Sequence, residues 1–246
     1  MQKKTNRIEM FVFLFNGRPD GIGNRIEQLL HIEKYCEATN KKCVYKWNNN
    51  RRYRRYPIYI RFKHIEIKET LSESDKTLPV YNRFSIKTFR TKLNYNLENH
   101  EFLFSLDLED YDTAIHIRGG DRLRKNPTDC NYSTIDELES CIIKTAKYVN
   151  ETESIKKCII VCEETKYISK IKELINKEIY ILPHDKKYHD WQDFYYLTRA
   201  TQNVIMCCKF STFSICASLL SNLNLITLFD SSKSSLRKFN AKIVKI

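Results

Sequence analysis

Short apolar runs alternate with amphipathic segments along most of this chain. Residues 8–15 form an apolar run that predicts a buried strand, and apolar positions recur at helical spacing over residues 22–39. A second strand is expected over residues 42–47. Residues 48–100 are basic, aromatic and irregular, with a loop expected around residues 72–74, so this stretch predicts no clear order of elements.

The alternation becomes regular in the second half of the chain. Strands are expected over residues 113–117, 158–162, 179–182, 204–207 and 225–228, and helices over residues 134–149, 166–176, 191–200 and 212–220. Strands that alternate with helices in this way form a parallel sheet with right-handed crossovers. Because the first half also begins with a strand, a turn and a helix, we predict an α/β protein of two Rossmann-like halves facing a cleft. The expected halves are residues 1–108 and 109–246.

The chain is strongly basic and carries no long apolar segment. Its net charge of +12 at pH 7 favours acidic partners such as phosphates, an anionic membrane surface or nucleic acid. No apolar run approaches the roughly 20 residues that span a bilayer, and residues 10–15 are too few for the core of a secretory signal. We therefore expect a cytoplasmic protein, whose charge also allows peripheral contact with an anionic membrane.

The nine cysteines do not form a set of metal ligands. Their number is odd, Cys207 and Cys208 are adjacent, and Cys158 and Cys162 share one expected strand without a partner pair. We therefore expect buried, reduced thiols and no metal site.

All five glycines of the chain lie in two short segments, each of which follows an expected strand. The first contains Gly21-Ile-Gly-Asn-Arg25 at the start of the first helix, with Gly21 and Gly23 in the turn and Asn24 and Arg25 directly after it. A helix start of this kind offers free N–H groups and a positive dipole end to an anion. A plain tight turn is the alternative, because the full dinucleotide-binding spacing and the Lys-Ser or Lys-Thr pair of a P-loop are absent.

The second glycine segment is His116-Ile-Arg-Gly-Gly-Asp121. Strand alternation places His116 and Arg118 on one face at the carboxyl end of the strand, which is where ligands bind in open α/β sheets. Arg118 can grip phosphate oxygens through two N–H groups, Asp121 can orient it, and Gly119 lets a ligand approach. The alternative is a structural Arg–Asp pair at a turn.

Three further segments carry polar groups of the same kind. Hydroxyls at the start of the helix over residues 212–220 would cap it and could receive a phosphate; the segment comprises Ser211, Thr212, Phe213 and Ser214. Taken alone, this segment is better explained by helix capping without a ligand. His184 and Asp185, together with Asp193, could contact a nucleotide base or ribose, although a polar loop and helix-dipole carboxylates explain them equally. The basic and aromatic run over residues 51–56 could bind nucleic acid, line an acceptor site or form a solvated face.

Taken together, these segments resemble the fucosyltransferase superfamily over residues 8–40 and 110–228. That family has a Gly-x-Gly-Asn turn, a His-x-Arg-x-x-Asp motif, and an Asp-Phe pair followed by a strand and a Ser/Thr-Phe-Ser helix start. The corresponding segments here are Gly21-Ile-Gly-Asn24, His116-Ile-Arg-Gly-Gly-Asp121, Asp193-Phe194 and Ser211-Thr-Phe-Ser214, in the same order. The chain departs from the pattern where the α1,2 and α1,6 enzymes carry a second arginine, here Gly119, and a Trp pair, here Ile215-Cys216.

The resemblance implies a GT-B-type glycosyltransferase that is inverting and needs neither a metal nor a cofactor. It would move a deoxyhexose, fucose from GDP-fucose in the first place, from the second half onto a glycan or glycolipid acceptor on the side of the first. The resemblance implies Arg118, Asp121 and Asn24 as catalytic residues, Arg25 at the acceptor, and a donor site made of Gly21, Gly23, His116, Gly119, His184, Asp185, Asp193, Ser211, Thr212, Phe213 and Ser214.

The general base and the donor sugar stay open at this point. His64 and Glu66 are candidates for the base, and a rhamnosyltransferase or another sugar transferase of the same fold is an alternative activity. From another class, the alternative is a basic protein that binds nucleic acid through residues 51–56, although we do not expect nucleic acid to be the natural partner.

Overall fold

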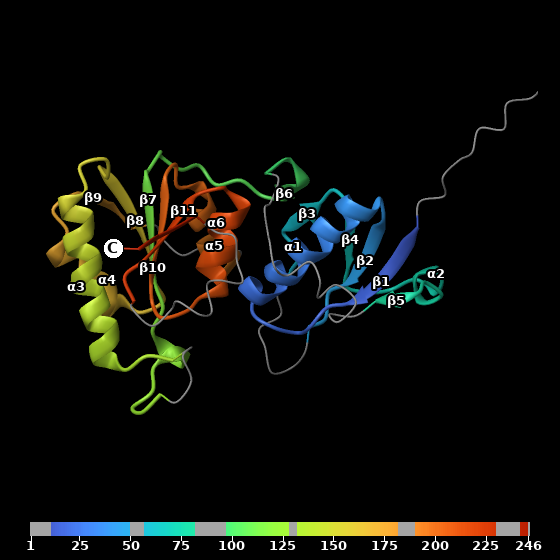
Figure 1. Cartoon of the computed structure of the whole chain (residues 1–246), viewed down its shortest axis with the longest axis horizontal. Helices are drawn as coiled ribbons and strands as arrows, with labels where there is room; N and C mark the ends of the chain where they lie inside the picture. Colours follow the sequence, from blue (N-terminus) through green and yellow to red (C-terminus); the bar gives the residue numbers. More distant parts are fainter. Residues whose placement is uncertain are drawn as a thin grey trace, which may run out of the picture.

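Two α/β halves lie side by side in the computed structural model, the first in blue to cyan with the green strand β6 (His100–Phe102), and the second in green to red (Figure 1). The structure describes residues 11–49, 57–81, 97–127, 132–181, 190–229 and 242–245. The basic run over residues 51–56 and the predicted site residues His184 and Asp185 lie outside these ranges.

The first half contains a four-stranded parallel sheet in the order β4-β2-β1-β5. Its elements are β1 (Val12–Asn16), α1 (Ile22–Thr39), β2 (Lys42–Lys46), β4 (Ile65–Lys68), α2 (Glu73–Lys76) and β5 (Val80–Tyr81). A separate antiparallel pair joins β3 (Ile60–Phe62) to β6 (His100–Phe102), which follows the 3-10 turn η2 (Leu97–Asn99). The strand–turn–helix–strand order predicted for the start of the chain is confirmed.

The loop expected around residues 72–74 is wrong, because a short helix begins there. Ser72 accepts a hydrogen bond from the backbone of Asp75, and the Asp75 carboxylate accepts one from the backbone of Ser72. This reciprocal capping satisfies two backbone donors that a helix start otherwise leaves free. The four-residue helix α2 forms for that reason.

The second half contains a six-stranded parallel sheet in the order β12-β11-β10-β7-β8-β9. Its strands are β7 (Thr113–Ile117), β8 (Lys157–Val161), β9 (Glu178–Tyr180), β10 (Asn203–Cys207), β11 (Asn224–Thr227) and β12 (Lys242–Lys245). The intervening elements are η3 (Gly120–Arg122), α3 (Ile135–Glu151), α4 (Thr165–Leu174), α5 (Asp190–Arg199) and α6 (Thr212–Leu220). The predicted parallel sheet is confirmed, and β12 is an additional strand.

The strand order of this sheet identifies where it binds ligands. The chain builds outward from β7 through β8 to β9, and then returns to the other side of β7 with β10, β11 and β12. This is the doubly wound order, and its switch point lies between β7 and β10. Ligands bind such sheets at the carboxyl ends of the strands beside the switch point. The predicted segments after β7 and β10 both begin there.

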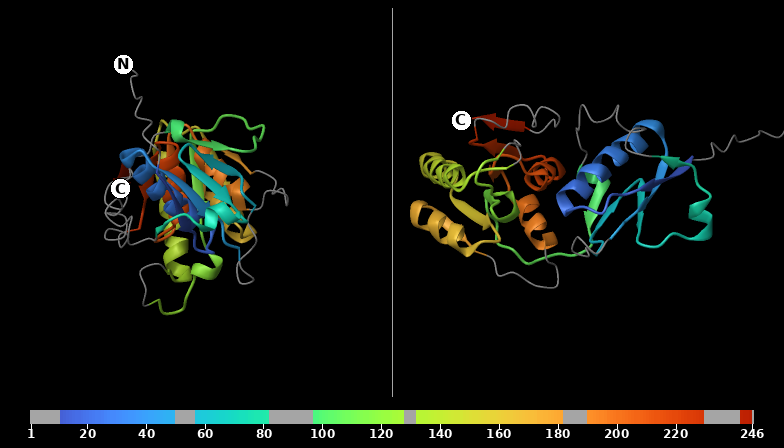
Figure 2. Two further views of the ribbon diagram at one scale, coloured as in Figure 1. Left: turned by 90° about the vertical axis from the view of Figure 1, so that its right-hand side faces the viewer. Right: turned by 90° about the horizontal axis from the view of Figure 1, so that it is seen from below.

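The helices of the second half cover both faces of its sheet. Helices α3 and α4 lie on the face away from the first half, whereas α5 and α6 lie on the face toward it (Figure 2). Leu138 and Ile171 belong to the apolar cluster on the far face, and Trp191 belongs to the cluster on the near face.

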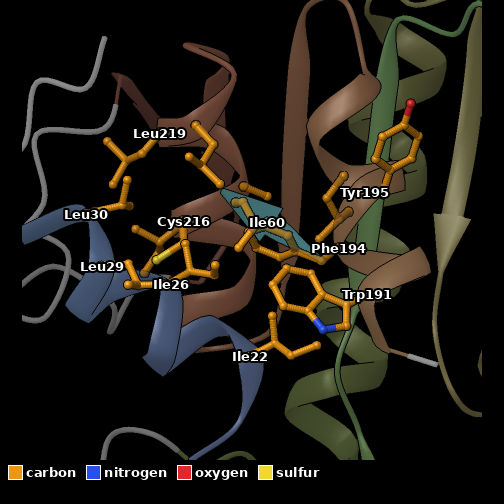
Figure 3. Close-up of a cluster of buried hydrophobic side chains, with 14 of the residues drawn as sticks. Ile22, Ile26, Leu29, Leu30, Ile60, Trp191, Phe194, Tyr195, Cys216 and Leu219 are labelled. Carbon is orange, nitrogen blue, oxygen red and sulfur yellow. The ribbon is translucent and has the colours of Figure 1, made fainter. Parts of the chain in front are cut away.

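The near-face cluster continues into the first half without a break. Ile26 and Leu29 of α1 pack in the same cluster as Phe194 of α5 and Leu219 of α6 (Figure 3). The two halves therefore share a core along α1, α5 and α6, and the predicted cleft does not run through this region. A cleft at the carboxyl edges of the sheets stays a prediction, as does the boundary between residues 108 and 109.

Eight of the cysteines lie in the described part of the chain, and all eight are free and buried. This confirms the expectation of reduced thiols for those eight. Within the described ranges no group of three His, Cys, Asp or Glu side chains could hold a metal ion. No helix in the same ranges is both long enough and apolar enough to cross a membrane.

Candidate functional site

The switch point of the second sheet brings together residues from two of the predicted motifs. His116, on β7, is buried and shares a 2.6 Å hydrogen bond between its Nδ1 and the Oγ of Ser214 on α6. The ring of Phe213 lies 5.3 Å from the imidazole, centre to centre. Burial, with the nearby charge of Arg118, lowers the pKa of His116 to about 3. His116 is therefore neutral at physiological pH, and it joins β7 to α6 instead of presenting a positive charge.

Arg118 follows β7 and presents its guanidinium beside this junction. Its side chain is 36% exposed, and its Nη2 donates a 3.3 Å hydrogen bond to Oδ1 of Asp121. The Nε of Arg118 is buried and has no hydrogen-bond partner among the described residues. A buried donor without a partner costs free energy, so Arg118 is suited to receive an anion at the switch point.

Sequence reasoning missed a second arginine at the same place. Arg122 lies in η3, and its Nε is also buried without a hydrogen-bond partner among the described residues. Burial raises the pKa of the Cys208 thiol to about 12, while the charges of Arg118 and Arg122 both oppose that rise. The two guanidinium groups therefore both lie within electrostatic range of the Cys208 thiol. The only sign of this second arginine in the sequence was that arginines occupy both position 118 and position 122.

Gly119 and Gly120 serve the protein's own packing. A Cβ atom on Gly119 would overlap the carboxylate of Glu164 and crowd the ring of Tyr167. The N–H of Gly120 donates a 2.6 Å hydrogen bond to Oε1 of Glu164, and Gly120 has a positive φ of 52°. Glu164 occupies the space that the missing side chain of Gly119 leaves, so this glycine is explained by packing, and its predicted ligand contact stays a prediction.

The start of α6 carries the third predicted segment. Ser211 caps the helix by accepting a 3.4 Å hydrogen bond from the backbone N–H of Ser214, and both serines are buried. The Oγ1 of Thr212 donates a 2.7 Å hydrogen bond to Oδ1 of Asn24, at the start of α1. The structure therefore joins two motifs that are 188 positions apart in the chain. Thr212 and Phe213 remain half-buried, whereas the serine hydroxyls are used inside the protein.

The two glycines of the first turn have different surroundings. A Cβ atom on Gly23 would lie 2.6 Å from the backbone nitrogen of Phe213, so Gly23 is the point where α1 and α6 approach each other closely. A Cβ atom on Gly21 would meet no atom within 4 Å. Packing against α6 explains the glycine at position 23, and the predicted donor contacts of Gly21 and Gly23 stay predictions.

Arg25 lies inside the first half and does not face an acceptor. Its side chain is fully buried, with the guanidinium carbon 4.3 Å from the centre of the Trp47 ring. Its Nε donates a 2.6 Å hydrogen bond to the carbonyl of Asp20, and its Nη2 donates one of 3.2 Å to Oδ1 of Asn49. The predicted acceptor contact is therefore wrong, because Arg25 holds the glycine turn in place.

Asp193 forms an acidic group with two carboxylates that sequence reasoning did not single out for the site. Burial, and after it the charges of Asp190 and Glu163, raise the pKa of Asp193 to about 7. A carboxyl group near half-protonation at neutral pH can donate a hydrogen bond as well as accept one. Such a group suits a nucleotide base that carries both donors and acceptors, so the predicted donor role of Asp193 stays a prediction.

The two candidate bases lie away from the switch point. Nδ1 of His64 is 2.7 Å from Oε1 of Glu33, a carboxylate that α1 buries. Glu66 is on β4 and pairs with Lys68 at 3.2 Å. Glu33 lies nine residues after Asn24 on α1, which is about 13 Å along the helix, so His64 does not lie beside Asn24.

Comparisons with known proteins show the same fold in several solved structures. No protein-family profile and no curated protein matches the sequence. A NodZ α-1,6-fucosyltransferase soaked with GDP-fucose superposes with a TM-score of 0.53 at 11% identity, over 89% of this chain and 96% of that chain. A fucosyltransferase NodZ from Bradyrhizobium gives 0.52 at 10% identity, over 89% and 95%. An Arabidopsis thaliana FUT1 mutant in complex with GDP gives 0.51 at 12% identity, over 92% and 72%. The chain therefore has a fold shared by these fucosyltransferases.

Proposed function

We propose that the protein is an inverting, GT-B-type glycosyltransferase that moves a deoxyhexose, in the first place fucose from GDP-fucose, onto a glycan or glycolipid acceptor. The observation that carries the proposal is the guanidinium of Arg118, whose buried Nε lacks a hydrogen-bond partner among the described residues, at the switch point of a doubly wound sheet. The fold shared with solved fucosyltransferases, some of them holding GDP or GDP-fucose, supports the same reading.

In the proposed reaction, negative charge develops on the β-phosphate as the sugar leaves. Arg118 stabilises that charge, and the N-terminal end of α6 contributes its free N–H groups. Arg122 adds a second guanidinium and would supply the charge that a second consecutive arginine provides in the α1,2 and α1,6 enzymes. Asp121 orients Arg118 through the 3.3 Å contact. We propose that no divalent metal is needed, because these groups already balance the charge of the diphosphate.

Residues from the first half complete the proposed site. Asn24 uses its carbonyl oxygen to accept from Thr212, which leaves its amide N–H groups to donate to a substrate. Asp193 would contact the nucleotide base or ribose. We propose a cytoplasmic location, with peripheral membrane contact through the basic surface where the acceptor is a glycolipid.

Calorimetry with GDP, UDP and TDP in moderate salt and EDTA tests the proposal. We expect saturable binding of GDP to the wild type and weaker binding to Arg118→Ala. Arg61→Ala is the matched control, because Arg61 forms an exposed pair with Glu101 in the separate β3–β6 strand pair, which is not part of the sheet that carries the switch point. Failure of all three nucleotides to bind would exclude a nucleotide-sugar transferase. Binding of DNA or RNA with a steep salt dependence, in the absence of nucleotide binding, would favour the nucleic-acid alternative.

The donor sugar is tested by the melting temperature with GDP-fucose, GDP-mannose and TDP-rhamnose. A ligand that binds only the folded state stabilises it by about 2.7 kcal/mol at a hundred times its Kd. A larger rise with TDP-rhamnose than with GDP-fucose would favour the rhamnosyltransferase alternative.

A further inference from the structure

A cavity of about 430 Å³ opens in the first half, at the carboxyl end of β1 between α1 and β5. Its volume lies in the range of pockets that bind small molecules. Besides Phe15, its lining includes Asn16, Arg18, Asn24, Glu27, His31 and Tyr81. Most of these groups are outside the anion site formed by Arg118, and only Asn24 belongs to both.

One face of α1 forms the polar wall of the cavity. Asn24, Glu27, Gln28 and His31 are spaced by three or four residues and therefore share that face. Gln28 is fixed there, because its Oε1 accepts a 2.8 Å hydrogen bond from the hydroxyl of Tyr45 and one of 3.2 Å from the backbone of Arg18. The wall is therefore held by the packing of the first half.

Glu27 and His31 form a pair in this wall. Nε2 of His31 lies 3.9 Å from Oε1 of Glu27, and the side chain of Glu27 remains 25% exposed. His31 is 6% exposed, and its Nδ1 has no hydrogen-bond partner among the described residues. A buried imidazole therefore lies behind a carboxylate that solvent, or a ligand in the cavity, can reach.

The cavity adjoins the proposed donor site through two contacts. Asn24, which lines the cavity, accepts the hydrogen bond from Thr212 at the start of α6. Burial, and after it the charge of Glu27, raise the pKa of Cys216, which lies on α6. Glu27 therefore lies within electrostatic range of α6, where the proposed donor site begins.

The lining indicates a neutral, hydroxyl-rich ligand. Amide groups donate hydrogen bonds to hydroxyls and accept them, carboxylates accept them, and the ring of Tyr81 offers an apolar face for a sugar ring. The lining holds two acidic side chains, Asp20 and Glu27, against the basic Arg18 and His31, so it lacks the excess of basic groups that would favour a phosphate. These features distinguish the cavity from the anion site.

We propose that this cavity binds a neutral saccharide acceptor and that Glu27 is the general base that takes the proton from its attacking hydroxyl. The inference rests on the proposed function, which supplies a nucleotide-sugar donor. The hydroxyl oxygen forms a bond to the anomeric carbon, and the bond from that carbon to the β-phosphate oxygen breaks. The electron pair of the broken bond leaves with the nucleoside diphosphate, and the hydroxyl proton moves to the carboxylate of Glu27. His31 positions that carboxylate.

The binding part is tested by saturation-transfer NMR with GDP present and galactose, N-acetylglucosamine, glucose and lactose as probes. We expect at least one probe to bind the wild type. Val80→Trp should weaken that binding at least tenfold, because Val80 is 59% exposed at the rim of the cavity and a larger side chain there closes it. Failure of every probe to bind, or unchanged binding by Val80→Trp, overturns the inference.

The catalytic part is tested by transfer from GDP-fucose to the probe that binds. Glu27→Gln should lower kcat by about 10²-fold, as loss of a general base does, with little change in KM. His31→Gln should lower kcat by a smaller factor, also without a change in KM. The matched control is Glu37→Gln, at an exposed position further along α1, which should transfer at the wild-type rate.

Two outcomes separate this inference from the proposed function. In the first outcome, calorimetry shows that GDP binds, but Glu27→Gln transfers the sugar as fast as the wild type, or no sugar is transferred to a probe that binds. The role proposed for Glu27 is then wrong, and the nucleotide site stands. If GDP does not bind, the proposed function fails and the inference fails with it.

Discussion

Replacing Gly23 by alanine adds one methyl group where α1 of the first half packs tightly against α6 of the second. The new Cβ atom would lie 2.6 Å from the backbone nitrogen of Phe213, 2.8 Å from its Cα and 2.9 Å from Oγ1 of Thr212. Two of these three neighbours are backbone atoms at the start of α6, which cannot turn away as a flexible side chain can. We therefore expect α1 and α6 to separate slightly, at the expense of the core that they share.

The expected loss of stability follows from two opposing effects. Overpacking a well-filled interior costs about 1–3 kcal/mol, and strain on the hydrogen bond between Thr212 and Asn24 adds up to about 1 kcal/mol. Alanine favours a helix over glycine by at most about 1 kcal/mol, which offsets part of this cost. The net loss is about 1–3 kcal/mol, and the melting temperature should fall by about 2–12 °C for a protein of this size.

Scanning calorimetry and urea unfolding of Gly23→Ala and Gly21→Ala, side by side, measure the effect. Gly21 lies two residues earlier and a Cβ atom there meets nothing within 4 Å, so its substitution should cost less than about 1 kcal/mol, the loss of a modest helix cap. If Gly23→Ala melts within about 1 °C of the wild type, the tight contact between α1 and α6 does not exist in solution. Equal losses in the two variants would show that the turn, and not the contact, needs glycine.

Three further predictions concern the switch point. Arg118→Ala should lower kcat by about 10²–10³-fold, and Arg118→Lys should recover little of that loss. The melting temperature should hardly change, because the pair between Arg118 and Asp121 is exposed. A large fall in melting temperature with normal turnover would show that Arg118 has a structural role instead. The pKa of Asp193 is raised to about 7, so the stability gained by its protonation is full below pH ~4 and is lost as the pH rises through 7. Urea unfolding should therefore show that Asp193→Asn stabilises the protein relative to the wild type by about 1–3 kcal/mol more at pH 8 than at pH 5, and equal effects at both pH values would contradict the raised pKa. The pKa of His116 is lowered to about 3, so NMR should show that its ring stays neutral down to pH ~4. The stability that the neutral, buried ring contributes should be lost as the pH falls from ~6.5 toward 3. An ordinary titration of His116 near pH 6.5 would contradict its burial.

The hydrophobic pattern predicted the described strands and helices of the second half, apart from β12, because each element there follows the simple alternation of a doubly wound sheet. The first half was harder, since β3 and β6 pair across a long stretch of sequence and α2 depends on one reciprocal cap at Ser72. The strand β12 begins and ends with a lysine, Lys242 and Lys245, which an edge strand tolerates but which a pattern of buried strands does not predict.

The sequence predicted which residues lie at the candidate site better than it predicted what each of them does there. His116 and Ser214 meet at the switch point, and Asn24 meets Thr212. A sequence shows where a glycine lies but does not show what fills the space that its side chain leaves free. Gly23 was therefore assigned to a ligand, and its packing against α6 was not foreseen. Glu27 was not singled out because nothing in the sequence shows that α1 forms one wall of a cavity.

The core shared by α1, α5 and α6 limits how substrates can enter and leave. Swinging the two halves apart would expose side chains such as Ile26, Leu29, Phe194 and Leu219 to water. Each such side chain costs about 1.5–3 kcal/mol when exposed, so full opening costs on the order of 10 kcal/mol and is reached by about one molecule in 10⁷. Dyes attached to α3 and α2 should accordingly keep a constant separation with and without GDP. Nucleotide exchange then depends on the segments at the carboxyl edges of the sheets, and a variant that loosened the α1–α6 contact would exchange nucleotide faster while losing stability.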